Sequence, residues 1–116
     1  MNKGIDEQFT TKDEPTFTAK LYVAGPIEQA KTIIRRECFP RGLCVTIEPT
    51  LYIYACGEEA GYVVGLLNYP RYPEAPAFLF TKAQMLLETL IRETHQWSGL
   101  LVTPDLTRFI SRRPEA

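Results

Sequence analysis

Two adjacent glutamates, Glu58 and Glu59, are the residues whose type and spacing best suit chemistry in this chain. They lie in a Gly-Glu-Glu-Ala-Gly segment, where residues 56–60 fit a hairpin loop. A carboxylate there can attack a sugar carbon, bind a basic partner surface or help to hold a metal. Adjacent residues of a strand point to opposite faces, so the two carboxylates converge only if the backbone curls. A solvated turn without chemistry is the plainer interpretation.

Other reactive side chains are few. His95 is the single histidine, and its position near the end of an expected helix suits an interaction with the helix dipole. The cysteines Cys38, Cys44 and Cys56 are odd in number and lack CxxC spacing, which argues against a disulfide framework and a zinc site. We therefore expect no metal and no cofactor.

The composition is that of one globular domain. The chain has 116 residues, of which 45% are hydrophobic and 23% charged. A net charge of −1 argues against nucleic acid as a partner, because a nucleic-acid footprint needs a surplus of Lys and Arg. No signal-peptide pattern and no apolar run of 18 residues is present, so we expect a cytoplasmic protein without membrane contact.

Hydrophobic periodicity predicts six elements in the order strand, helix, strand, strand, helix, strand. Period-2 alternation begins at Phe17, and a helix follows from Pro26 until Pro40 and Gly42 end it. The next expected element is a strand that is bent at Pro49 or lies at the edge of the sheet, because proline removes a hydrogen-bond donor. The remaining expected elements are a doubly covered strand over 62–69, a helix over 78–96 and a strand over 99–103 that residues 106–110 extend.

This order predicts an α+β fold, the ferredoxin-like βαββαβ sandwich, with two helices on one face of a four-stranded antiparallel sheet. We expect residues 1–16 to form a flexible arm, 17–110 the single domain and 111–116 a flexible tail. The open face of the sheet would carry Tyr52 and Tyr54, together with Thr46 and Glu48. Such a face serves either a homo-oligomer interface or the binding of a ligand or partner.

The Tyr69-Pro70-Arg71-Tyr72 loop combines rigid aromatic rings with an arginine. These residue types are enriched at binding hot spots, although a stiff connector has the same composition. The predicted binding surface therefore comprises the acidic turn, the open-face tyrosines and this loop, namely Tyr52, Tyr54, Glu58, Glu59, Tyr69, Arg71 and Tyr72.

Two segments resemble nucleoside 2-deoxyribosyltransferases. Residues 20–27, Lys-Leu-Tyr-Val-Ala-Gly-Pro-Ile, are similar to the opening strand and loop of that family, and Glu59-Ala60-Gly61-Tyr62 is similar to its catalytic stretch. The resemblance implies that Glu59 is a nucleophile and that Ala24-Gly25 forms the nucleoside-side loop. It also implies a helix after Glu59, whereas residues 62–69 have a strand-like composition.

A second resemblance covers more of the chain. The segments Tyr-Val-Ala-Gly-Pro-Ile, Gly-Leu-Cys-Val-Thr, Gly-Glu-Glu-Ala-Gly and Asn-Tyr-Pro-Arg are similar to small uncharacterised bacteriophage-encoded proteins. That resemblance implies a non-catalytic phage accessory or counter-defence protein that binds a host protein or a small nucleotide-type ligand. We therefore predict a binding protein rather than an enzyme, and one that forms a homo-oligomer. The alternative is a deoxyribosyltransferase-like enzyme with Glu59 as nucleophile.

Overall fold

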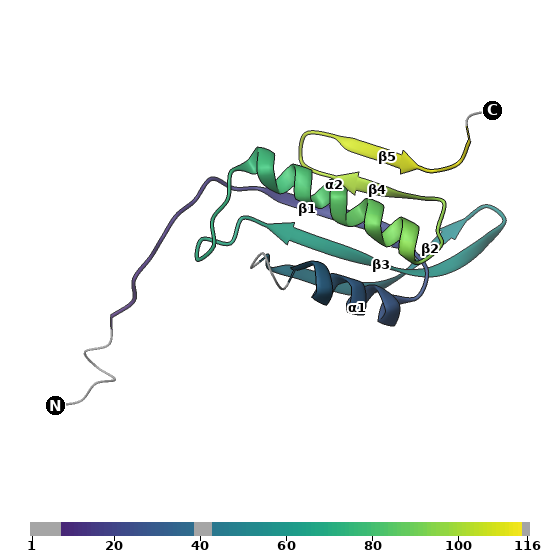
Figure 1. Ribbon diagram of the computed structural model, residues 1–116, viewed down its shortest axis with the longest axis horizontal. Coiled ribbons are helices and arrows are strands. Elements are labelled where there is room, and N and C mark those ends of the chain that lie inside the picture. The colour runs from purple at the N-terminus through teal and green to yellow at the C-terminus, as the bar shows by residue number, and fades with distance from the viewer. Residues whose placement is uncertain (1–7, 39–42, 115–116) are drawn as a thin grey trace.

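The computed structural model describes residues 8–38 and 43–114. They form a five-stranded antiparallel sheet in the order β2-β3-β1-β4-β5, and both helices cover the same face of it (Figure 1). Part of the predicted arm (residues 1–7) and part of the predicted tail (115–116) lie outside the described residues. So does the predicted helix stop at residues 40–42. The elements are β1 (Thr18–Ala24), α1 (Ile27–Cys38), β2 (Val45–Tyr54), β3 (Gly57–Leu67), α2 (Pro76–Glu93), β4 (Ser98–Val102) and β5 (Thr107–Ser111).

The prediction of a four-stranded sheet is wrong by one strand. Residues 106–110 do not extend β4; the chain reverses after Thr103 and returns as β5, antiparallel to β4. The Thr103 hydroxyl accepts hydrogen bonds from the Asp105 and Leu106 amides, each at 3.2 Å, and so stabilises the turn. Because these two amides bond to the Thr103 hydroxyl and not to a neighbouring strand, the chain turns here, and residues 106–110 form a hairpin with β4.

The hairpin between β2 and β3 is tighter than predicted. Only Ala55 and Cys56 lie between the strands, and Tyr54 pairs with Gly57, so Glu58 and Glu59 belong to β3 and not to a loop. β2 is an edge strand, which explains why it accepts Pro49. β3 continues as a strand to Leu67, which is incompatible with the helix that the deoxyribosyltransferase resemblance requires.

The core lies between the sheet and the helices. Alternate residues of β1 and β3 are buried on the helix side, because successive strand residues face opposite ways. Pro76 begins α2 at a position where its missing N–H costs nothing. The buried core residues of the strands and helices are Ala19, Leu21, Val23, Ala30, Ile33, Ile34, Cys38, Tyr62, Val64, Leu66, Ala83, Leu86, Leu87, Leu90, Ile91 and Leu101.

The chain after α2 carries an exposed aromatic side chain. Trp97 is 49% exposed, and the guanidinium groups of Arg112 and Arg113 lie 5.2 and 5.6 Å from its ring centroid. His95 adopts a φ of 60°, a left-handed conformation that ends the helix. Neither helix, within the described residues, is long and apolar enough to cross a membrane.

Candidate functional site

The open face carries tyrosine and glutamate side chains where β2 and β3 form their hairpin. Tyr52 lies opposite Glu59, and Glu48 lies opposite Val63. Tyr22 of β1 pairs with Val63 from the other side, so the row reaches the centre of the sheet. Residues that face each other on antiparallel strands share a face, with Cβ atoms about 5 Å apart. The register therefore groups these side chains on the face that the helices leave open.

Tyr52 is fixed in place by its own hydroxyl. The half-buried phenol donates a hydrogen bond of 2.8 Å to the Tyr62 carbonyl oxygen. Burial raises the pKa of Tyr52 to about 12, and hydrogen bonding with the Val23 backbone offsets part of the rise. The side chain is therefore neutral near pH 7. Because the hydroxyl is already bonded, the ring face is the part of Tyr52 left for a ligand.

Gly61 brings the Tyr52 ring against the backbone. A Cβ atom at position 61 would lie 2.5 Å from Cε2 of Tyr52, 2.8 Å from Cα of Ala24, and closer still to the Val23 carbonyl oxygen. Gly61 is buried, although it lies on the open-face side of β3. A glycine is required because any side chain would displace the aromatic ring or two backbone segments.

The β1–α1 loop adjoins this point. The Gly25 amide donates a 3.0 Å hydrogen bond to the Ala60 carbonyl, and Gly25 has a φ of +118°, which strongly favours glycine. The side chain of Gln96 packs against it, since a Cβ at position 25 would lie 2.9 Å from Nε2. The Ala24-Gly25 loop, which the deoxyribosyltransferase resemblance places beside the nucleoside, thus lies next to the hairpin.

The two glutamates of the hairpin face opposite sides. Glu59 pairs with Tyr52 on the open face, whereas Glu58 pairs with Ile53 on the side of the helices. Both are exposed. Only Glu59 therefore belongs to the row of open-face side chains, and Glu58 offers a neighbouring residue of the same type for comparison. Tyr54, also exposed, lies on the open-face side at the end of β2.

The predicted loop residues lie elsewhere. Tyr69 and Tyr72 have ring centroids 6.0 Å apart, and the Arg71 guanidinium lies 6.0 Å from the Tyr72 centroid. The two rings line a groove beside the end of α1 and the start of β2; we call it the tyrosine groove, and its other described lining residues are Ile34, Arg35, Cys38, Leu43, Cys44 and Val45. The structure therefore separates the seven predicted site residues into two groups at opposite ends of β2.

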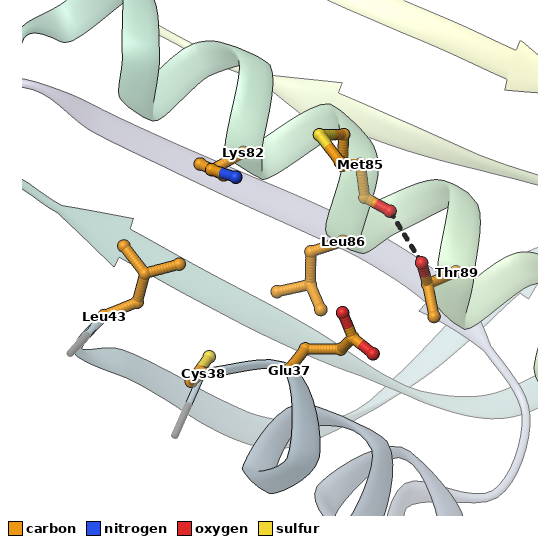
Figure 2. Close-up of a pocket in the computed structure, with 7 residues that line it drawn as sticks. All are labelled: Glu37, Cys38, Leu43, Lys82, Met85, Leu86 and Thr89. Carbon is orange, nitrogen blue, oxygen red and sulfur yellow. Dashed lines mark hydrogen bonds between the residues drawn. The ribbon is translucent and has the colours of Figure 1, made fainter. Parts of the chain in front are cut away.

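A smaller pocket lies between the helices (Figure 2). Its walls are mostly apolar, and Glu37 of α1 and Lys82 of α2 contribute its charges. The Thr89 hydroxyl beside it donates a 2.9 Å hydrogen bond to the Met85 carbonyl, one turn earlier in α2. This hydroxyl is thus engaged with its own helix, and the pocket offers little polar surface to a ligand.

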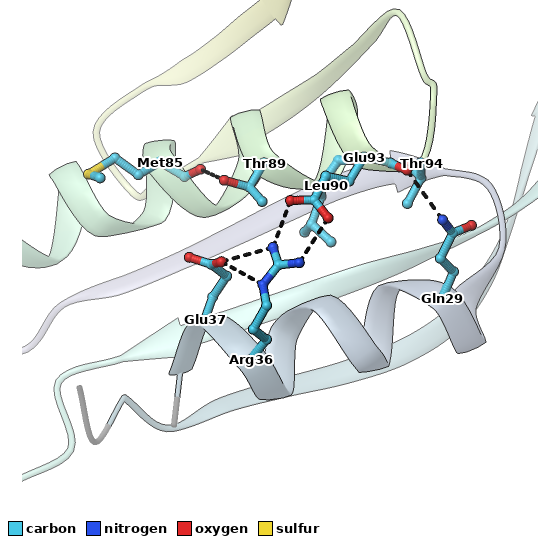
Figure 3. A network of polar contacts seen from close by, with 8 residues as sticks. All are labelled: Gln29, Arg36, Glu37, Met85, Thr89, Leu90, Glu93 and Thr94. Carbon is cyan, nitrogen blue, oxygen red and sulfur yellow. Dashed lines mark hydrogen bonds and ion pairs between the residues drawn. The ribbon is translucent and has the colours of Figure 1, made fainter. Parts of the chain in front are cut away.

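An ion-pair network closes the helix pair on its solvent side (Figure 3). Arg36 of α1 donates two hydrogen bonds, at 2.9 and 2.7 Å, to the two carboxylate oxygens of Glu93 on α2, and a third to Glu37. The Arg36 guanidinium lowers the pKa of Glu93. Gln29 adds a hydrogen bond to the Glu93 carbonyl. The network connects the two helices, and it lies on the helix side of the sheet, away from the open face.

The described residues contain no group of three metal-ligating side chains close enough to hold an ion. Tyr52, Glu59 and the Ala24-Gly25 loop stay predictions as site residues; the structure shows that they are neighbours. The sequence did not indicate the fit between Gly61 and Tyr52. Gly61, directly after the predicted turn, indicates a close contact at this position. Only the pairing of β2 with β3 shows that the contact is with the Tyr52 ring.

The sequence matches no protein-family model, and no curated protein matches it. Two solved structures share the fold. A phage SAM lyase in its apo state superposes with a TM-score of 0.72 at 12% identity, covering 94% of this chain and 100% of the other. A phage SAM lyase in complex with S-methyl-5'-thioadenosine has a TM-score of 0.62 at 14% identity, covering 90% and 96%.

These neighbours correct two predictions. The prediction of a non-catalytic binding protein is contradicted, and so is the prediction that the chain is not an enzyme, because the fold is shared with a lyase over at least 90% of both chains. The neighbours are phage proteins, in agreement with the phage resemblance, and one of them binds a small nucleoside-type molecule. Nothing in them supports the deoxyribosyltransferase resemblance.

Proposed function

We propose that this protein is an enzyme that breaks down S-adenosylmethionine (SAM) and releases S-methyl-5'-thioadenosine. The likeness of fold to a phage SAM lyase, over at least 90% of both chains, carries the proposal. The identity of 12–14% transfers no residue roles, so the site must be argued from the side chains of this chain.

The chemistry needs no metal and no water. The bond between the sulfonium sulfur and the amino-acid chain breaks, and its electron pair stays on the sulfur of the departing thioether. The carboxylate of the same substrate can form the new carbon–oxygen bond and close a lactone. The negative carboxylate and the positive sulfonium are both consumed, so charge balances without proton transfer. Such an internal displacement depends on holding the substrate in a folded shape.

The open face supports such a role. Glu59, with Glu48 further along the row, offers negative charge to the substrate's ammonium group, which keeps its charge throughout. The sulfonium loses charge as the bond breaks, so apolar surroundings favour the transition state over the reactant. Val63 and the Tyr22 ring supply such surroundings, and an aromatic face also attracts a cation. The Tyr52 ring, backed by Gly61, is suited to stacking on adenine.

Removal of SAM would starve host enzymes that depend on it, so the predicted counter-defence role would be exercised by catalysis in the host cytoplasm. The ligand would be a small nucleoside-type molecule, in keeping with the predicted partner class. A host-protein partner and a homo-oligomer stay predictions.

We also infer that the fold is a ferredoxin-like sandwich with one added edge strand. The order β2-β3-β1-β4 and the shared helix face support this classification, and β5 is the addition.

The test is to incubate the purified protein with SAM and follow both products by liquid chromatography and mass spectrometry. We expect S-methyl-5'-thioadenosine to accumulate in proportion to enzyme, with a lactone as the co-product and no isotope from ¹⁸O-labelled water in the lactone formed initially. No conversion above that of a heat-treated sample would overturn the proposal.

A further inference from the structure

The chain leading into β1 is an extended arm, residues 8–17, that runs away from the sheet and helices (Figure 1). Phe9 on this arm is 84% exposed, the largest exposed fraction of any big apolar side chain described. Exposure of a phenylalanine side chain to water is unfavourable, so a surface that covers Phe9 would stabilise the docked arm. The body of its own chain does not provide that cover.

The base of the arm is held firmly. Asn68 is buried; its side-chain amide donates a 2.8 Å hydrogen bond to the Pro15 carbonyl, and its backbone amide donates one of 3.1 Å to Phe17. Its side-chain oxygen accepts a 3.0 Å hydrogen bond from the Glu74 amide. Because the base is fixed, the direction of the arm is set in advance, and ordering its tip on a partner costs less entropy.

The tyrosine groove has the complementary character. Its described lining residues are apolar or aromatic except for Arg35, and they include no acidic residue. Arg35 forms no ion pair among the described contacts. The described part of the arm carries Asp13 and Glu14 against Lys12 and so has an excess of negative charge. An apolar groove with a free guanidinium suits a segment that combines Phe9 with acidic residues.

We propose that the arm of one copy of this chain docks in the tyrosine groove of a second copy, with Phe9 packed against the exposed side of the tyrosine rings and the acidic pair facing Arg35. The base of the arm lies near the groove of the same copy, since Pro70 lies beside the arm while Tyr69 and Tyr72 line the groove. Each copy thus carries both an arm and a groove, and two copies that exchange arms reciprocally can form a closed dimer. This inference does not rest on the proposed function.

Cysteine trapping tests the docking directly, because the exposed Cys44 lines the groove. In a Cys56→Ser background, Phe9→Cys should form a reducible, disulfide-linked oligomer through Cys44, and a further Cys44→Ser change should abolish it. Phe109→Cys is the matched control, because Phe109 is also exposed but lies on the open face of the sheet and not on the arm. It should give at least tenfold less disulfide-linked oligomer. A disulfide within one chain, or none, would overturn the proposal.

A second measurement needs no engineered cysteine. Light scattering should give the unmodified protein at least twice the 13.2 kDa chain mass, and Phe9→Ser should bring it to a single chain. Arg35→Glu should weaken the assembly at least tenfold, and combining it with Asp13→Arg and Glu14→Arg should restore it. A single-chain mass for the unmodified protein at micromolar concentration would contradict the inference.

Discussion

The two ends of β2 are built in different ways. At the hairpin end, a tyrosine ring lies against a glycine backbone, its hydroxyl is bonded to a carbonyl, and a glutamate lies opposite it. At the other end, the tyrosine groove is apolar, contains a free arginine and has no acidic residue in its described lining. From Val45 to Tyr52 the strand rises roughly 23 Å. One small ligand cannot contact both ends, so the single predicted binding surface divides into two separate surfaces.

The largest difference is expected in catalysis. Glu59→Gln should lower kcat/KM for SAM by about 100-fold, because it removes a charge directed at the substrate. Glu58→Gln removes the same charge one residue away but on the opposite face, so its effect should stay below about threefold. Steady-state rates of thioether release compare the two variants. Equal losses would mean that the open face is not the catalytic side.

The next effect concerns the glycine that receives Tyr52. Gly61→Ala should lower the free energy of unfolding by about 2 kcal/mol, since the new Cβ meets two backbone segments and the ring. Gly57→Ala is the matched control, because its Cβ would meet nothing closer than 3.7 Å and should change stability by less than about 0.5 kcal/mol. Urea denaturation measures both. A neutral Gly61→Ala variant would show that the hairpin end is loosely packed.

Loss of the Tyr52 hydroxyl should cost less. Tyr52→Phe removes one hydrogen bond to a backbone carbonyl, so we expect about 1 kcal/mol, whereas Tyr54→Phe, at an exposed position, should be close to neutral. The pKa of Tyr52 is raised to about 12 from an ordinary value near 10, so the folded state keeps the proton longer than the unfolded state.

The stability contributed by this raised pKa is fully present below about pH 10 and is lost as the pH rises towards 12. Tyr62, buried in the core with its pKa also raised to about 12, contributes in the same direction. Tyr52→Phe should therefore make the alkaline decline less steep than in the unmodified protein. Urea midpoints between pH 9 and 12 test this, and identical slopes would contradict the assignment.

The smallest effect is expected on the helix side. Arg36→Gln should lower stability only slightly, because both partners of its ion pair are well exposed and screened by solvent. The lowered pKa of Glu93 means that this contribution is present at neutral pH and is lost as the pH falls through the folded-state pKa. The thermal midpoints of variant and parent should differ less at pH 3 than at pH 7. A large difference at both would indicate a packing role.

Alternation along the chain was enough to assign the open face, because a strand repeats every two residues regardless of its partners. For Pro49 it left a bend and an edge position open, and the strand order decides for the edge. It could not give the length of the turn at Ala55-Cys56, since Glu58 and Glu59 are polar whether they lie in a loop or in an exposed strand. The β4–β5 reversal depends on one threonine hydroxyl. The Gly61–Tyr52 fit depends on register, which no single segment encodes.

Separation of the site from the tyrosine groove is tested most directly by mapping where the product binds. S-methyl-5'-thioadenosine titrated into ¹⁵N-labelled protein should shift the amides of Gly25, Tyr52, Glu59 and Gly61 most strongly, with small changes at Arg35, Cys44 and Tyr69 to Tyr72. Shifts confined to the groove residues, with the hairpin amides unmoved at saturation, would contradict the assignment of the open face as the site of SAM cleavage.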